Sequence, residues 1–216
     1  MNNLNILYED NHIIVVEKKP NMLCQSDNTN DIDLLTILKA YIKEKYNKQG
    51  NVYLGLVHRL DRPVGGLMVF AKTSKAASRL SEIIRNKEMT KEYLLVCHNN
   101  LDDEGIMEDY IDRDEKKSFI SKNGKFAKLE YKVLDRKDNL NLVKVNLITG
   151  RHHQIRLQFA SRNNPLYADN LYGNKEQDNI ALFCYHISFK HPTKDEIMDF
   201  KLLPNGKIWS KFDYEA

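Results

Sequence analysis

One carboxylate, Asp61, lies between two arginines in the segment HRLDRPVGGLMVFAK, which runs from His58 to Lys72. Arg59 and Arg62 flank it, and a cation within a few ångströms favours the charged form of a carboxylate. A charged carboxylate suits a nucleophile or a base better than a proton donor. The same residues would also fit a surface turn with an ordinary ion pair. Both interpretations stay open at this point.

A second polar group, TGRHHQIR, extends from Thr149 to Arg156, between an expected strand end at Ile148 and an expected helix. Its backbone N–H groups and Arg151 could hold an anion such as phosphate. Arg156 lies about one turn into the helix, where it could reach a carboxylate from another segment. The alternatives are a surface arginine at 156 and polar capping residues at His152 and His153.

Tyr93 opens an expected strand in the segment Lys91-Glu92-Tyr93. An aromatic ring close to a charged acid and to cations could stack on a flat substrate such as a nucleobase. Core or edge packing is the alternative role for a strand tyrosine.

Several kinds of site lack support. Four histidines, His152, His153, His186 and His191, occur without HExxH, CxxC or an obvious acidic partner, so we predict no metal site. GxxxxGK[ST], GxGxxG and GxSxG are also missing, which gives nucleotide cofactors and serine hydrolysis no support.

Hydrophobic periodicity predicts one α+β domain over residues 1–216. Helices are expected at Asp31–Tyr46, from a Ser74 cap to about Lys87, and from about His152 to Ser161. Strands are expected at Ile6–Val16 as a pair, Tyr53–His58, Gly66–Ala71, Glu92–Cys97, around Leu129–Val133, at Leu142–Ile148, and in a hairpin of Ile180–Lys190 with Ile197–Leu203. The charged stretch Leu101–Lys125 is expected to leave the core.

Composition predicts a globular chain. Of 216 residues 42% are hydrophobic, and 33 basic against 30 acidic residues give a net charge of +3. Apolar runs are too short to span a membrane, and charges interrupt the N-terminal segment, so we expect no signal peptide and a cytoplasmic location. The cysteines, Cys24, Cys97 and Cys184, are expected to be reduced. Basic residues gather in two groups, after Asp61 and between Arg113 and Lys128, which permit nucleic-acid binding without requiring it.

These motifs resemble the RluA-like RNA pseudouridine synthases, enzymes that isomerise selected uridines in ribosomal or transfer RNA. HRLDRPVGGLMVFAK is similar to the family's catalytic motif. Further similar segments follow the family's order along nearly the whole chain: ILYEDNHIIVVEKKPNML, KEYLLV, LITGRHHQIRLQFA, LYG and HISFKHPTKDEIMDFKLLP.

The resemblance implies a pseudouridine synthase-like domain with a mixed, largely antiparallel sheet and flanking helices. It implies that Asp61 is the catalytic carboxylate, that Tyr93 stacks on the target uracil and that Arg156 pairs with Asp61. Arg59 would help to hold the RNA. We count Arg62, Arg151 and His152 as further expected RNA contacts.

The resemblance also implies an RNA partner, ribosomal or transfer RNA, and no cofactor; we expect a monomer. Val64-Gly65-Gly66 stands where the family often has Thr-Ser-Gly, and Ala168 precedes Asp169 where it often has glycine. We expect no separate N-terminal RNA-binding domain. Two other hypotheses are a catalytically silent RNA-binding module and a glycosidase, although a glycosidase normally needs a second acid.

Overall fold

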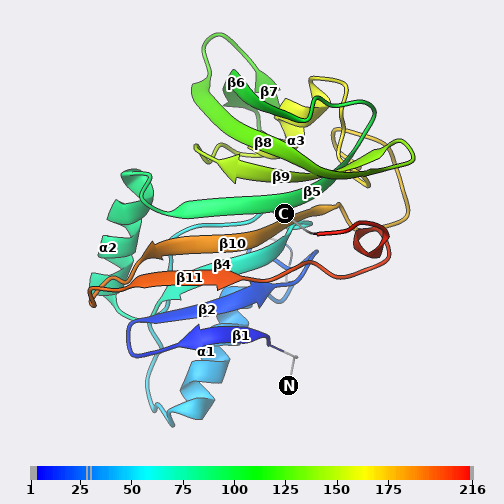
Figure 1. The fold of residues 1–216 in the computed structure, drawn as a ribbon. Coiled ribbons are helices and arrows are strands. Elements are labelled where there is room, and N and C mark those ends of the chain that lie inside the picture. Colours follow the sequence, from blue (N-terminus) through cyan, green and yellow to red (C-terminus); the bar gives the residue numbers. More distant parts are fainter. Residues whose placement is uncertain (1–3, 28, 30, 215–216) are drawn as a thin grey trace. The chain divides into compact units, whose positions relative to one another are not determined.

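The computed structural model describes residues 4–27, 29 and 31–214, and Figure 1 shows its elements. The chain divides into two compact units, the first formed by Met1–Met89 with Ile187–Leu202 and the second by Thr90–His186 with Leu203–Ala216. The predicted α+β class with a mixed, largely antiparallel sheet is confirmed. The single-domain prediction concerns how the units are joined and stays a prediction. Among the described residues, no helix has the length and apolar character needed to cross a membrane.

Antiparallel strands form the centre of the first unit. The strands β1 (Ile6–Glu9), β2 (Ile13–Lys18) and β4 (Gly65–Ala71) lie in that order. All residues of β2 and β4 are buried, which explains their continuous apolar sequences. Lys18 at the end of β2 lies opposite Gly66 near the start of β4. This register brings the end of β2 close to the segment that carries Asp61.

The helices of the first unit do not begin where predicted: the first helix begins three residues later than the predicted Asp31, and the second begins one residue earlier than predicted. In α1 (Leu34–Lys45), the side chain of Asp33 caps the helix by accepting from the N–H of Thr36. In α2 (Ser74–Arg85), Thr73 is the cap instead of the predicted Ser74. Thr73 has an extended backbone, and its hydroxyl accepts from the N–H of Ala76 at 3.1 Å. The prediction for Ser74 was wrong because two adjacent hydroxyl residues look alike in sequence.

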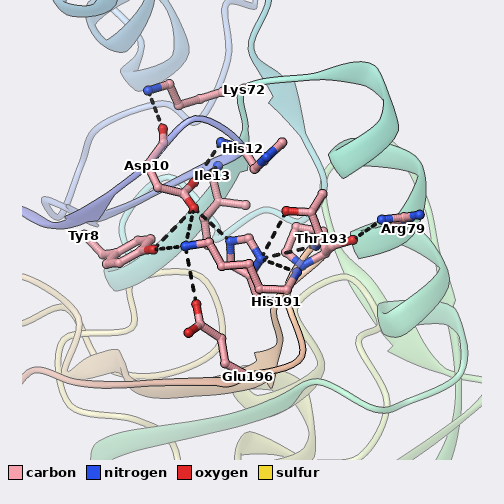
Figure 2. Close-up of polar contacts among 11 residues, drawn as sticks. Tyr8, Asp10, His12, Ile13, Lys72, Arg79, His191, Thr193 and Glu196 are labelled. Atoms are coloured by element: carbon pink, nitrogen blue, oxygen red, sulfur yellow. Dashed lines mark hydrogen bonds and ion pairs between the residues drawn. The ribbon is translucent and has the colours of Figure 1, made fainter.

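Hydrogen bonds join the two hairpin turns of the first unit (Figure 2). Asp10, after β1, accepts from the backbone N–H groups of His12 and Ile13. His191 lies between β10 (Leu182–Lys190) and β11 (Ile197–Lys201), and its Nε2 is 3.0 Å from Asp10. Since Nδ1 of His191 accepts a hydrogen bond from the N–H of Lys194, Nε2 carries the proton and donates a hydrogen bond to the carboxylate of Asp10. These hydrogen bonds fix the turn of the hairpin of β1 and β2, and β2 ends at Lys18.

The second unit is a series of antiparallel strands. Residues 182–186 of β10 form its first strand. The neighbouring strands follow in the order β5 (Thr90–His98), β9 (Leu140–Leu147), β8 (Lys125–Lys137), β6 (Glu104–Arg113) and β7 (Ser118–Ile120). The predicted strands in this part are confirmed. The expectation that Leu101–Lys125 leaves the core was wrong, because this stretch forms β6 and β7. Buried Met107 and Ile111 alternate with exposed residues on β6, and the many charges obscured that pattern.

The third helix is shorter than predicted. α3 (Gln154–Ala160) begins after His153, whose φ of 52° is left-handed and therefore outside the helix. Six of its seven residues are buried, including Arg156 and both glutamines. A helix buried on all sides must satisfy its polar side chains internally.

Candidate active site

Asp61 lies in a turn of the first unit, directly before β4. The N–H of Val64 donates to the carbonyl of Asp61 at 3.0 Å and closes the turn. Leu60 and Val64 are buried on either side, whereas Asp61 itself is half-buried. Two apolar anchors therefore hold this carboxylate at the end of a buried strand.

Side chains fix the segment that precedes Asp61. His58 Nε2 accepts from the N–H of Val69 at 3.0 Å. The thiol of Cys24 donates to the carbonyl of Leu60 at 3.1 Å, and burial raises its pKa and keeps it neutral. The strand predicted over Tyr53–His58 is limited to β3 (Gly55–Leu56), because these contacts replace strand pairing in the remainder.

A fully buried lysine, Lys18, anchors the turn from below. Its ammonium donates to the backbone carbonyls of Lys19, Met22 and Arg62 at 3.2, 2.7 and 3.0 Å. Burial lowers the pKa of Lys18 to about 8, and the charge of Asp61 is among those that oppose this shift. Lys18 therefore places a positive charge close to the turn, and its hydrogen bond to the carbonyl of Arg62 connects the residue after Asp61 to β2.

The two arginines beside Asp61 are exposed. Arg62 forms an ion pair with Asp31 at 2.6 Å, and about half of each side chain is exposed. Both arginines are accessible to a ligand, and a phosphate at Arg62 would compete with Asp31. Their predicted RNA contacts stay predictions.

The sequence after the turn contains the departure noted above, Val64-Gly65-Gly66. Gly66 has φ of 133°, which L side chains rarely adopt, so glycine is required there. Gly65 and Gly66 are buried within β4, and Gly66 pairs with Lys18 of β2. Ala168, the other departure, has φ of 57°, a strained conformation that glycine would adopt more easily.

Tyr93 lies on β5 in the second unit, opposite Val145 of β9, and is 7% exposed. Lys91 lies on the same face because side chains alternate along a strand. Burial lowers the pKa of Lys91, and its Nζ is 3.7 Å from the place of a Cβ on Gly150. On the opposite face, Glu92 contacts His186 Nδ1 at 2.7 Å and accepts from the hydroxyl of Tyr185.

Arg156 forms a buried, two-point ion pair with Asp169. Its Nε and Nη2 donate to the two carboxylate oxygens at 2.8 and 2.7 Å. One of those oxygens also accepts from the N–H groups of Leu171 and Tyr172, and the guanidinium lies 5.3 Å from the ring centre of Tyr172. The expectation that Arg156 reaches a carboxylate of another segment is thus confirmed for Asp169. Its predicted pairing with Asp61 stays a prediction.

The polar segment before α3 is held to β7 and β8. Ser118 Oγ donates to the carbonyl of His152 and lies 2.9 Å from its Nδ1, which places the His152 proton on Nδ1. Arg151 Nε donates to the carbonyl of Phe126 at 2.8 Å. His152 also lines a shallow pocket of about 460 Å³ with Arg113, Asp114 and Glu115. In the described part of the chain, no group of three His, Cys, Asp or Glu side chains could hold a metal ion.

Sequence analysis missed two charged residues of these sites, Lys18 and Asp169. A lysine at the end of the apolar run IIVVEK was the available signal for Lys18. It also missed the buried amides of α3, where Gln154 donates to Gln158 and Gln158 donates to Asp109. Gln154 also donates to the carbonyl of Lys128 on β8, and Asp109 lies on β6, so no local pattern reveals these contacts between elements.

Comparison with known families decides the chain's relationship. Residues 12–161 match the family described as RNA pseudouridylate synthase, and they make up more than half of the chain. The chain belongs to this family. The predicted resemblance to RluA-like RNA pseudouridine synthases is therefore confirmed.

Two relatives illustrate the similarity. A protein of Aquifex aeolicus, named as an uncharacterized RNA pseudouridine synthase, is 35% identical over 217 residues, covering 92% of this chain and 69% of that protein. The ribosomal large subunit pseudouridine synthase D of Neisseria meningitidis is 32% identical over 221 residues, covering 94% of this chain and 59% of that protein. The chain thus spans less than two thirds of some pseudouridine synthases that it matches.

The fold is shared with solved pseudouridine synthase structures. Human RNA Pseudouridylate Synthase Domain Containing 4 has a TM-score of 0.77 at 20% identity, covering 92% of this chain and 88% of that chain. This likeness confirms the predicted pseudouridine synthase-like fold.

Proposed function

We propose that this chain isomerises specific uridines of RNA to pseudouridine with Asp61 as the catalytic carboxylate. The observation that carries the proposal is the fixed turn of Asp61, whose neighbouring residues are anchored by Cys24, Lys18 and the buried start of β4. A reacting carboxylate must be held in place before the substrate arrives, and these anchors do so. Membership of the family supports this chemistry.

The reaction breaks the bond between ribose C1′ and uracil N1, turns the base and joins C1′ to C5. The proton on C5 is lost and N1 gains one, so the product is an isomer and needs no cofactor. Asp61 has three chemically consistent roles: attack on C1′, addition to C6 of the ring, or removal of a ribose proton. Tyr93 is proposed to stack on the uracil and to assist removal of the C5 proton.

Arg156 is proposed to pair with Asp61 through its guanidinium, which Asp169 orients by accepting from Nε and Nη2. Arg59, Arg62, Arg151 and His152 are the proposed RNA contacts. The target uridine must leave its stack, which costs a few kcal/mol and is easiest in single-stranded loops.

The proposed substrate is ribosomal or transfer RNA. Several relatives are named as ribosomal large subunit pseudouridine synthases, which makes large-subunit ribosomal RNA the first substrate to examine. We further propose that the protein acts as a monomer in the cytoplasm, without a cofactor.

The test is to incubate the purified protein with ribosomal and transfer RNA from cells that lack it, and to map pseudouridine. Wild-type protein should modify defined uridines, and Asp61→Asn should reduce the product to background. Asp195→Asn is the matched control, because Asp195 is an exposed acid of the same unit that, among the described residues, pairs only with the exposed Lys190. Full activity of Asp61→Asn, or no product from the wild type with any cellular RNA, would contradict the proposal.

The same experiment separates the alternative function, a silent RNA-binding module. Such a module would bind RNA equally well before and after the Asp61→Asn substitution and would isomerise no base in either form. Loss of product with retained RNA binding in Asp61→Asn would instead assign a chemical role to the carboxylate.

A further inference from the structure

Burial lowers the pKa of two lysines in the described part of the chain, Lys18 and Lys91. The ammonium of Lys18 donates to three backbone carbonyls. The described residues offer Lys91 no hydrogen bond, ion pair or aromatic contact, and only the thiol of Cys184 favours its charged form. A poorly hydrated ammonium without a partner raises the free energy of the protein, so an acceptor from a bound ligand would be favourable there.

Lys91 lies near the start of β5, two residues before Tyr93 and on the same face of the strand. Lys91 is partly buried, whereas Tyr93 is buried. Residues two apart on a strand are separated by about 6–7 Å. A uracil stacked on the ring of Tyr93 would therefore have its edge close to the Lys91 side chain. Both carbonyl oxygens of that edge, O2 and O4, accept hydrogen bonds.

The space beside the Lys91 ammonium is open toward Gly150. Glu92 pairs with Asn146 of β9, so the chain that leaves β9 passes beside Lys91. Lys91 Nζ lies 3.7 Å from the place of a Cβ on Gly150. Apart from the chain neighbours of Gly150, no other heavy atom of the described residues lies within 4 Å of that place. Gly150 is also exposed, so a ligand can approach the ammonium from this side.

Hydrogen bonds hold Gly150 in place from both sides. Thr149 Oγ1 donates to Gln154 Oε1 at 2.8 Å, and the N–H of Arg151 donates to the same oxygen at 3.0 Å. Gly150 thus lies between two anchored residues. The opening beside Lys91 is therefore present before a ligand arrives, as electrostatic catalysis requires.

The proposed reaction creates negative charge on the uracil by each of the three routes open to Asp61. Attack on C1′ and removal of a ribose proton both break the bond from C1′ to N1 and leave its electron pair on the base, where N1, O2 and O4 share the charge. Addition to C6 moves the electrons of the ring double bond onto O4. A fixed cation at a uracil oxygen stabilises this charge more than it stabilises the neutral starting base.

We propose that Lys91 is a further catalytic residue, whose protonated ammonium donates a hydrogen bond to a carbonyl oxygen of the target uracil while that ring carries negative charge. Lys91 keeps its proton throughout: C5 loses a proton and N1 gains one, and neither comes from or stays on the ammonium. This inference rests on the proposed function. The competing role is a contact with an RNA phosphate, which an ammonium also binds.

The test measures the single-turnover rate and the RNA affinity of wild type and Lys91→Met, with the ribosomal RNA in which the wild type forms pseudouridine. The rate should fall about 100-fold to 1,000-fold, the loss that follows removal of one donor to a developing negative charge. Affinity, measured by filter binding, should change by less than about twofold, because the neutral base gains little from the ammonium. The dependence of affinity on salt should stay constant.

Lys91→Arg restores the positive charge and should recover most of the rate that Lys91→Met loses. In the wild type the active ammonium loses its proton as the pH rises through its pKa, which burial holds below the usual lysine value. The wild-type rate should therefore fall at alkaline pH. In Lys91→Arg this fall should begin at a higher pH, because a guanidinium stays charged. The uracil N3–H titrates alike in both proteins.

Stability separates a catalytic role from a structural one. Because Lys91→Met removes a poorly hydrated charge without a partner, it should unfold at an equal or higher urea concentration than the wild type. Lys132→Met is the matched control. It removes an exposed lysine of β8 in the same unit, and it should leave both the rate and the affinity unchanged.

Three results would overturn the proposal. The first is a wild-type rate in Lys91→Met. The second is an unchanged rate with weaker binding and a slope of log affinity against log salt smaller by about 0.7, which would identify a phosphate contact. The third is a loss of both urea stability and rate that Lys91→Arg does not recover, which would make Lys91 structural. Failure of the proposed function is distinguishable, because the wild type itself would then form no pseudouridine, and this inference would fall with it.

Discussion

The turn that carries Asp61 and the helix that carries Arg156 are both held by buried polar contacts, but the contacts differ in kind. In the first unit, one ammonium, that of Lys18, is surrounded by uncharged backbone carbonyls. In the second unit, the guanidinium of Arg156 meets a full opposite charge on Asp169 at two points.

This difference predicts how each region responds to change. Removing one member of a buried ion pair leaves an uncompensated charge in a poorly solvated place. Removing the Lys18 ammonium leaves neutral carbonyls, which are less costly to bury unpaired. A lysine can also lose its proton within an accessible pH range, whereas an arginine cannot. We therefore expect the Arg156 region to be the more sensitive to substitution and the Asp61 region to be the more sensitive to pH.

The largest expected effect is that of Asp169→Ala. It should lower the free energy of unfolding by about 3–5 kcal/mol, since it removes the opposite charge that compensates the buried guanidinium of Arg156. It should also reduce pseudouridine formation, because the guanidinium loses the partner that orients it. Urea unfolding and the RNA modification assay measure the two effects.

Two further variants sharpen this test. Asp213→Ala removes an exposed acid of the same unit that lies 3.8 Å from Lys137, and it should cost less than about 1 kcal/mol. Asp169→Asn keeps an oxygen for the N–H groups of Leu171 and Tyr172 but removes the charge, so its loss should be intermediate. Equal losses for Asp169→Ala and Asp213→Ala would show that the pair contributes no more than a surface contact.

The second effect is that of Lys18→Met. It should lower the free energy of unfolding by about 2 kcal/mol, because three carbonyls lose their donor while the cost of burying a charge is relieved. Pseudouridine formation should fall as well, since the carbonyl of Arg62 is no longer tied to β2. Lys19→Met is the matched control. The side chain of Lys19 is half-exposed, so its substitution should change the free energy of unfolding by less than about 0.5 kcal/mol. Equal free energies of unfolding for Lys18→Met and Lys19→Met would show that the hydrogen bonds of Lys18 do not stabilise the turn.

The sequence predicts most of the elements that position these two regions. The apolar runs of β2 and β4 and the helical period of α1 follow from short-range patterns of hydrophobic residues. The sequence pattern did not reveal β6, since charged residues occupy four of its six exposed positions, Glu104, Glu108, Asp112 and Arg113. Nor did it separate Thr73 from Ser74 as a cap, because backbone conformation decides between them.

The candidate site was predicted less completely. Motif resemblance drew attention to Asp61, Tyr93 and Arg156, but it named no role for Lys18 or Asp169. Lys18 contacts a carbonyl 44 residues away, and Asp169 contacts a side chain 13 residues away on another element. Such partnerships depend on tertiary packing, which local sequence patterns do not encode.

The smallest expected effect concerns pH and returns to the lone ammonium of Lys18. Its pKa is lowered by burial to about 8, whereas an exposed lysine in the unfolded chain has a pKa near 10.4. Between these values the unfolded chain holds a proton that the folded protein has released, so this group makes the free energy of unfolding rise with pH. The stability advantage of wild type over Lys18→Met should therefore grow by about 1–2 kcal/mol from pH 8 to pH 10. Urea unfolding of both proteins across this range measures the difference, in which other titrating groups cancel. The difference in free energy of unfolding between wild type and Lys19→Met should stay constant across this pH range. If the difference between wild type and Lys18→Met were also constant, Lys18 would keep its proton, and the Asp61 turn would be no more sensitive to pH than the Arg156 helix.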